Sequence, residues 1–227
     1  LFYTTDGSDP YHFNTDSGAI EVSEQAMAFE NPIPIDGTTT VKARYYSKSI
    51  FGSVAWSALT EATFTLGTDD LVISELMYHP TPPTDAEREQ GGTSASQFEY
   101  LVIMNTGSSA ADLDGVHFAA GVEFDFTGGD IATLAAGESV ILVRNRSAFE
   151  SRYGTGHPVA GEYGGKLDDS GETLRLVDGG GAVIHAFRYE DSEPWPVNAD
   201  GGGATLVLSD APASKPDSSK AESWIEG

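Results

Sequence analysis

Cysteine is absent from this chain of 227 residues, which excludes disulfide bonds, cysteine-ligated metal sites and thiol catalysis. No run of about 18 apolar residues occurs, so no segment is expected to insert into a membrane as a helix. Basic residues are scarce. The 12 Lys and Arg stand against 35 Asp and Glu and give a net charge of -23, which repels phosphate. We therefore expect no nucleic-acid partner.

Motifs of enzyme active sites are also missing. There is no Gly-x-Ser-x-Gly elbow and no phosphate-binding glycine loop. None of the histidines has the spacing of a metal-binding His-Glu-x-x-His motif; they are His12, His79, His117, His157 and His185. His185 falls in an alternating strand pattern and is expected on a sheet surface. The sequence therefore predicts that this chain is not an enzyme.

Helical periodicity is weak, and strand patterns dominate. Short helices are expected only at residues 147–153 and 85–90. The rest consists of short alternating runs separated by Gly, Asp and Pro at spacings near ten residues. A hairpin turn is expected at residues 178–181. This pattern is typical of an all-β sandwich or barrel.

A short polar break divides the chain. We expect one module at residues 1–66, a linker at 67–69 and a second module at 70–227. Residues 80–96 are rich in Pro, Gly, Ser and Thr and are expected to form a mobile loop. The chain opens on a strand pattern, so we expect it to be a piece of a larger protein.

The first module carries the strings YTTDGSDP at residues 3–10, PIPI at 32–35 and TTTVKAR at 38–44. This set resembles the small C-terminal β-sandwich of chitobiase-type hexosaminidases, which also accompanies fibronectin-type modules. In physical terms the first string is a strand that enters an aspartate-stabilised turn and ends at a proline.

The second module carries an ordered set of strings. They are LVISE at residues 71–75, EYLVIMN at 99–105, DLDG at 112–115, LAAGESVIL at 134–142, KLDDSGETL at 166–174, PWP at 194–196 and DGGGATL at 200–206. In this order they resemble the lamin-tail domain, with Val102 in place of the family's second acidic residue and His117 near its usual aromatic. The resemblance implies an immunoglobulin-like β-sandwich of a kind found in exported bacterial proteins. The predicted fold class is therefore all-β, an immunoglobulin-like sandwich plus a smaller β-sandwich module.

Two groups of aspartates leave a choice between metal binding and turn formation. Calcium prefers several oxygen ligands, and turns also favour aspartate because its carboxylate bonds backbone amides. We favour the turn interpretation and expect no cofactor, with calcium as the weaker alternative. The candidate ligands are Asp6, Asp9, Asp168 and Asp169, with Asp16 and Asp178 near them in the sequence.

Exposed aromatic residues are the usual platforms of carbohydrate sites. Tyr45 and Tyr46 are consecutive, so in a strand they face opposite sides and one is expected to be exposed. We treat them as a candidate platform. Trp56 and Trp195 are expected to pack within their modules.

Three arginines form the one local basic cluster: Arg144, Arg146 and Arg152. Two interpretations are open: a patch that docks an acidic neighbour, or separate intramolecular ion pairs, of which we favour the second.

Two interpretations of the function remain. In the first, the chain is a pair of non-catalytic structural or interaction modules of a larger exported bacterial protein and acts as a spacer or a protein–protein adhesion unit. Its partners would be other domains of the parent protein, or protein or glycan at a cell surface, and its location secreted or cell-surface. The alternative is a carbohydrate-binding accessory module of a secreted polysaccharide-degrading enzyme. The acidic surface also predicts tolerance of high salt.

Overall fold

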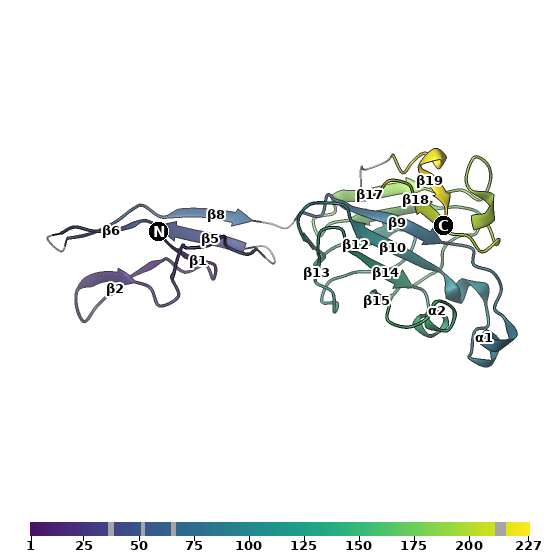
Figure 1. Ribbon diagram of the computed structural model, residues 1–227, viewed down its shortest axis with the longest axis horizontal. Coiled ribbons are helices and arrows are strands. Elements are labelled where there is room, and N and C mark those ends of the chain that lie inside the picture. Colours follow the sequence, from purple (N-terminus) through teal and green to yellow (C-terminus); the bar gives the residue numbers. More distant parts are fainter. Residues whose placement is uncertain (36–38, 51–52, 65–66, 212–216) are drawn as a thin grey trace. The chain divides into compact units, whose positions relative to one another are not determined.

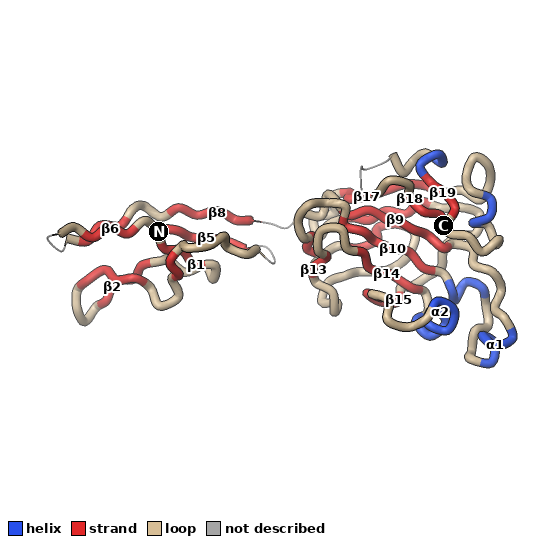
Figure 2. Tube along the Cα trace, in the orientation of Figure 1, coloured by secondary structure: helices blue, strands red, loops and turns tan. Residues whose placement is uncertain are grey.

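A computed structural model of the chain describes residues 1–35, 39–50, 53–64, 67–211 and 217–227 (Figure 1). The chain forms two compact units, Leu1–Leu66 and Gly67–Gly227. Strands predominate in both of them (Figure 2).

The first unit is built from eight strands among its described residues. They are β1 (Phe2–Thr4), β2 (Tyr11–Asn14), β3 (Ala19–Val22), β4 (Met27–Ala28), β5 (Thr39–Arg44), β6 (Tyr46–Lys48), β7 (Val54–Trp56) and β8 (Thr60–Phe64). Four of them make an antiparallel sheet in the order β4-β1-β5-β8, and β2–β3 and β6–β7 are separate hairpins.

The two faces of this four-stranded sheet differ in polarity. Because paired residues share a face and alternate residues along a strand change face, the pairing assigns each side chain. One face, here called the uncharged face, carries Tyr3, Met27, Thr39, Val41, Ala43, Thr60, Ala62 and Phe64. The opposite face carries Phe2, Thr4, Ala28, Thr40, Lys42, Arg44, Glu61 and Thr63.

The second unit contains the remaining elements. Its strands are β9 (Leu71–Met77), β10 (Tyr100–Asn105), β11 (Ala111–Asp112), β12 (His117–Ala120), β13 (Thr133–Leu134), β14 (Ser139–Val143), β15 (Val159–Glu162), β16 (Thr173–Val177), β17 (Val183–Arg188), β18 (Leu206–Leu208) and β19 (Trp224–Glu226). Its helices are α1 (Asp85–Glu89) and α2 (Arg146–Tyr153), with 3-10 turns η1 (Ala95–Phe98), η2 (Val197–Ala199) and η3 (Ala221–Ser223). A six-stranded sheet has the order β15-β14-β10-β9-β18-β19, and a three-stranded sheet has the order β12-β16-β17.

These two sheets enclose one hydrophobic core. In β10, Leu101 and Ile103 point inward and are fully buried, while Val102 between them points outward. Leu174 and Leu176 meet them from the three-stranded sheet. Two sheets with a shared core form a β-sandwich, so the predicted immunoglobulin-like fold class is confirmed.

A β-bulge at Ser74 interrupts the alternation of β9. Before it Ile73 faces the core, and after it Leu76 does, because the extra residue shifts the pairing with β10. The amide of Ile73 donates to Nδ1 of His185 over 3.1 Å. The expectation that His185 is a sheet-surface residue was therefore wrong: it is half-buried and joins β17 to β9.

Both predicted helices are present, but the expected mobile loop at residues 80–96 is anchored. It contains α1, whose first turn is closed by a capping box between Thr84 and Glu87. The guanidinium of Arg152 on α2 donates to the carbonyls of Thr81 and Pro82 and to both carboxylate oxygens of Glu87. The Pro- and Gly-rich composition of this segment predicted mobility. The prediction failed because composition does not reveal hydrogen bonds to a residue that is distant in the sequence.

Candidate ligand-binding groove

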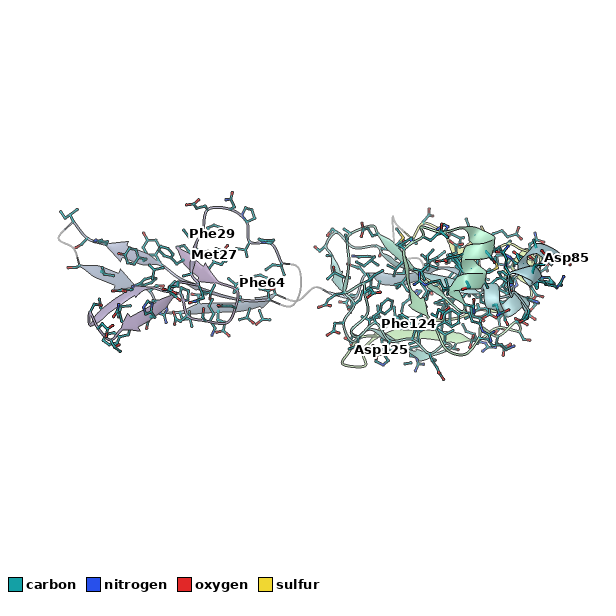
Figure 3. The ribbon with its side chains drawn as sticks, turned by 90° about the horizontal axis from the view of Figure 1, so that it is seen from below. Met27, Phe29, Phe64, Asp85, Phe124 and Asp125 are labelled. Carbon is teal, nitrogen blue, oxygen red and sulfur yellow. The ribbon has the colours of Figure 1, made fainter. Side chains whose placement is uncertain are left out.

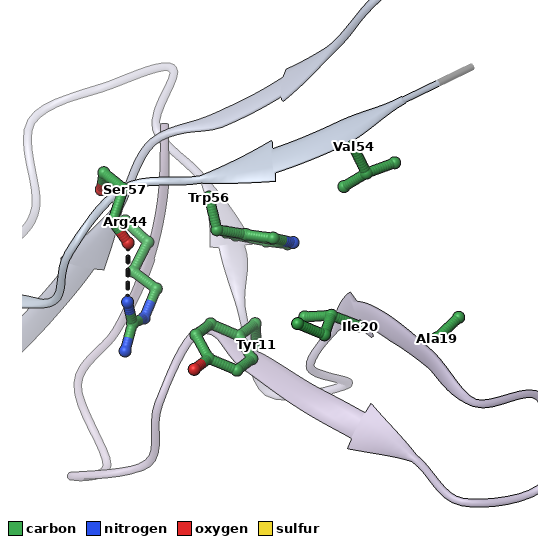
Figure 4. A pocket seen from close by; sticks show the side chains of 7 residues that line it. All are labelled: Tyr11, Ala19, Ile20, Arg44, Val54, Trp56 and Ser57. Atoms are coloured by element: carbon green, nitrogen blue, oxygen red, sulfur yellow. Dashed lines mark hydrogen bonds between the residues drawn. The ribbon is translucent and has the colours of Figure 1, made fainter.

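A concave site lies in the first unit, between its two hairpins (Figure 4). Its volume is about 500 Å³. Its wall is formed by Tyr11, Ala19, Ile20, Arg44, Val54, Trp56 and Ser57. Here it is called the hairpin groove.

Trp56 holds this groove together. Its ring centroid lies 5.0 Å from that of Tyr46, 5.7 Å from that of Tyr11 and 6.0 Å from that of Phe2. The indole Nε1 is buried, and no described residue accepts a hydrogen bond from it. A buried donor without a partner is costly, so a ligand oxygen that reached it would gain a hydrogen bond.

Arg44 forms the polar end of the groove. Its Nε and Nη2 donate to the two carboxylate oxygens of Asp9, both over 2.7 Å, and Nη1 donates to the carbonyl of Ser57. The guanidinium also lies 4.2 Å from the centre of the Tyr11 ring. The hydrogen bonds from Arg44 hold the pKa of Asp9 below its usual range. The guanidinium is thus fixed in place.

The hairpin groove is lined by both apolar and polar groups. It combines an aromatic and aliphatic wall with fixed N–H donors, which suits a neutral ligand rich in oxygen acceptors. The residues that line it include the hydroxyl side chains of Tyr11 and Ser57 but no carboxylate or histidine.

The structure separates the two tyrosines proposed as a platform. Tyr45 is 61% exposed and does not line the hairpin groove. Tyr46 packs against Trp56 behind the groove wall. Sequence reasoning missed Tyr11 as the second groove aromatic, because only the contact between the Tyr11 and Trp56 rings shows that β2 lies near β7.

The candidate calcium ligands act in their own turns. The carboxylate of Asp6 accepts from the amide of Ser8, and that of Asp168 accepts from the amide of Ser170. Asp9 is paired with Arg44, and Asp169 is half-buried in the turn after Asp168. Asp178 behaves in the same way, because its carboxylate accepts from two amides of its hairpin turn. Asp16 is exposed. Within the described ranges, no three His, Asp or Glu side chains converge as metal ligands do.

A buried carboxylate in the second unit escaped the sequence analysis. Glu99 is 0% exposed and accepts from the amide of Leu167 over 2.9 Å and from the hydroxyl of Tyr163 over 3.2 Å. Its Oε1 lies 3.5 Å from Nη1 of Arg144, without hydrogen-bond geometry. Burial raises the pKa of Glu99 to about 7, although Leu167 and Arg144 oppose the shift.

All three arginines of the basic cluster have acidic partners, as the ion-pair interpretation predicted. The pairs are Arg144 with Glu99, Arg146 with Glu150 and Arg152 with Glu87. They differ in environment: the Arg146 pair is exposed, whereas the other two are partly or fully shielded from water. The hydrogen bonds from Arg152 lower the pKa of Glu87 to about 2.

Comparison with known families identifies both units. Residues 65–191 match the Lamin Tail Domain family, and residues 1–55 match the Fn3 associated family. Both are non-catalytic types of domain, and no catalytic family matches. No curated protein matches the chain.

Among solved structures, the crystal structure of a DUF4876 family protein from Bacteroides thetaiotaomicron is similar over 94% of this chain and 68% of that one. It has 13% sequence identity and a TM-score of 0.31. No described helix is long and apolar enough to cross a membrane. The family match covers more than half of the sequence, and the chain therefore belongs to the Lamin Tail Domain family, with an Fn3-associated unit ahead of that domain.

Proposed function

We propose that the chain is a pair of non-catalytic interaction modules of an exported protein. In this proposal the lamin-tail unit is a self-contained scaffold. The Fn3-associated unit binds another protein domain through its uncharged face. The partner is a further domain of the parent protein or a protein of the cell surface.

The observation that carries this proposal is the exposure of apolar side chains in the first unit. Among the described residues of the first unit, Pro10 is buried, but no Ala, Val, Ile, Leu, Met, Phe, Tyr or Trp is. Met27 is 45% exposed, Phe64 48% and Phe29 49%, and all three lie in this unit (Figure 3). A small sheet needs a second layer on its apolar face for stability, and exposed apolar patches on soluble proteins mark interaction sites.

Photo-crosslinking tests the proposal with a matched pair of positions. Phe64 and Thr63 are adjacent in β8 and point to opposite faces. Benzoyl-phenylalanine at position 64, in the intact parent protein in its own host, should yield an adduct with another protein domain. The same probe at position 63 should give much less.

Adduct peptides sequenced by mass spectrometry would identify the partner. Equal yields at the two positions would contradict the proposal. An adduct found only with the lamin-tail unit of the same chain would also contradict it, because the face would then be covered internally.

Carbohydrate binding is the second candidate, and the hairpin groove favours it. The groove offers an aromatic wall from Tyr11 and Trp56 and fixed donors from Arg44, the combination that neutral sugars require. This function would suit an accessory module of a polysaccharide-degrading enzyme.

A glycan array probed with the intact chain tests this second function. Ile20→Glu places a charge in the hairpin groove at a side chain that is 45% exposed, and it should abolish any signal. Ile50→Glu, at a position 94% exposed and outside the groove, is the matched control. An array without signals, or a signal that Ile20→Glu leaves unchanged, would rule out sugar binding at this groove.

A further inference from the structure

A second concave site lies on the lamin-tail unit, on the outward face of the six-stranded sheet beside α2. Its volume is about 290 Å³. Its lining comes from three strands, from α2 and from the segment after it: Glu75, Tyr100, Val102, Ile141, Phe149, Tyr153 and His157. Here it is called the sheet pocket.

Aromatic rings form one side of the sheet pocket. The centroid of the Tyr100 ring lies 5.4 Å from that of Phe149 and 5.2 Å from that of Tyr153, in edge-on arrangements. His157 continues the cluster, 5.6 Å from Phe149. The floor is aliphatic, since Val102 and Ile141 point outward from the sheet and are partly buried.

A single carboxylate lies in this apolar and aromatic setting. Glu75 is half-buried, and its Oε1 accepts a hydrogen bond of 2.6 Å from the hydroxyl of Tyr100. Burial together with this hydrogen bond raises the pKa of Tyr100, so the phenol stays a neutral donor. Within the described part of the chain, no Lys, Arg or His lies within 4.0 Å of the Glu75 carboxylate.

A cationic side chain lies near the sheet pocket in the sequence, but it does not pair with Glu75. Arg152, on α2 next to Tyr153, is engaged by Glu87 and by two backbone carbonyls, its guanidinium stacks on Phe98, and it also interacts with the side chain of Tyr153. Its carboxylate partner is Glu87, and it forms no ion pair with Glu75. A half-buried carboxylate without a cation is unfavourable in this setting, and the arrangement favours a positively charged ligand.

We infer that the sheet pocket binds an alkylammonium group, such as the end of a lysine side chain. An ammonium has three donors and no acceptor, which matches the free oxygen of Glu75. Aromatic rings attract such cations through their faces. The aliphatic floor suits the flexible four-carbon stem of lysine, and the pocket is too small for a large ligand. The inference is independent of the proposed contact surface, because it concerns the other unit.

The probe is Nα-acetyl-lysine methylamide, titrated into the intact chain and followed by amide chemical shifts. Saturable shifts are expected at residues 75, 102 and 153. The norleucine analogue, which lacks only the ammonium, should bind at least about tenfold more weakly, the factor that corresponds to one charge-assisted contact. Cadaverine in a parallel titration separates a lysine side chain from a free amine. Binding of both probes or of the lysine probe alone assigns the pocket to protein lysines, and binding of cadaverine alone assigns it to small amines.

Glu75→Gln tests the carboxylate. It keeps an acceptor for Tyr100 and should weaken probe binding about tenfold or more. Glu138→Gln removes the same charge at an exposed position outside the sheet pocket and should leave binding unchanged. The inference is overturned if neither amine gives saturable shifts, if the norleucine analogue binds equally well, or if the two variants bind alike. Thermal unfolding of both variants shows whether each is folded.

Discussion

Glu99 is a buried carboxylate whose folded-state pKa lies near 7, against an ordinary value of 4.5. Between these two pH values the unfolded chain releases the proton and the folded chain keeps it. The contribution of Glu99 to stability is therefore fully present below pH 4.5 and is lost as the pH rises through about 7. The shift corresponds to about 3 kcal/mol.

Glu99→Gln should remove this dependence. Glutamine preserves an acceptor for the amide of Leu167 and carries no proton to release. The free energy of unfolding, measured in urea from pH 5 to pH 8, should fall with pH in the native chain and fall less in the variant. Glu138→Gln, which changes the same charge at an exposed site, is the control. Identical pH slopes in the two variants would show that Glu99 titrates normally.

At the scale of elements, one side chain joins α2 to the segment around α1. Arg152 makes its bonds to Glu87 and to two carbonyls in a site where both charged side chains are largely shielded. Arg152→Ala leaves the Glu87 carboxylate without its partner and should lower the free energy of unfolding by about 2–3 kcal/mol. Chemical denaturation measures this change.

The matched control lies on the same helix. Arg146 forms an exposed pair with Glu150, so Arg146→Ala should change stability by less than about 1 kcal/mol. The low pKa of Glu87 gives the Arg152 pair a stability that is present above pH 4.5 and is lost as the pH falls towards 2. Equal effects of the two substitutions at pH 7 would contradict the anchoring role of Arg152.

The strands and helices were largely readable from the sequence, whereas their mutual contacts were not. Alternation predicted β14 and β16, and the spacing of Phe149 and Tyr153 predicted α2. The role of His185 depends on a bulge in a strand more than 100 residues away, and local periodicity does not report it. The hairpin groove and the sheet pocket were missed for the same reason, because each joins strands that are distant in the sequence.

At the scale of the whole molecule, the net charge of -23 dominates. Like charges repel in the compact state, and salt screens that repulsion. The melting temperature should therefore hold or rise from low to molar salt, as scanning calorimetry would show. A melting temperature that decreases steadily over this range would contradict a surface suited to high salt.

The families of both units and the all-β class were evident in the sequence, because ordered strings of turn and strand residues identify them. The difference between the units was not evident. The lamin-tail unit buries a full core, whereas the uncharged face of the first unit has no second layer among the described residues. Composition does not show this difference, because only the strand pairing places the apolar side chains on one face.

Amide hydrogen exchange on the intact chain tests this central claim most directly. Strands β5 and β10 are both central in their sheets, with a neighbour on each side. If the first unit lacks a core layer of its own, the amides of β5 should exchange at least about 100-fold faster than those of β10. This factor corresponds to a difference of roughly 3 kcal/mol in opening free energy. Equal protection of β5 and β10 would show that the first unit is complete by itself and would contradict the proposed contact surface.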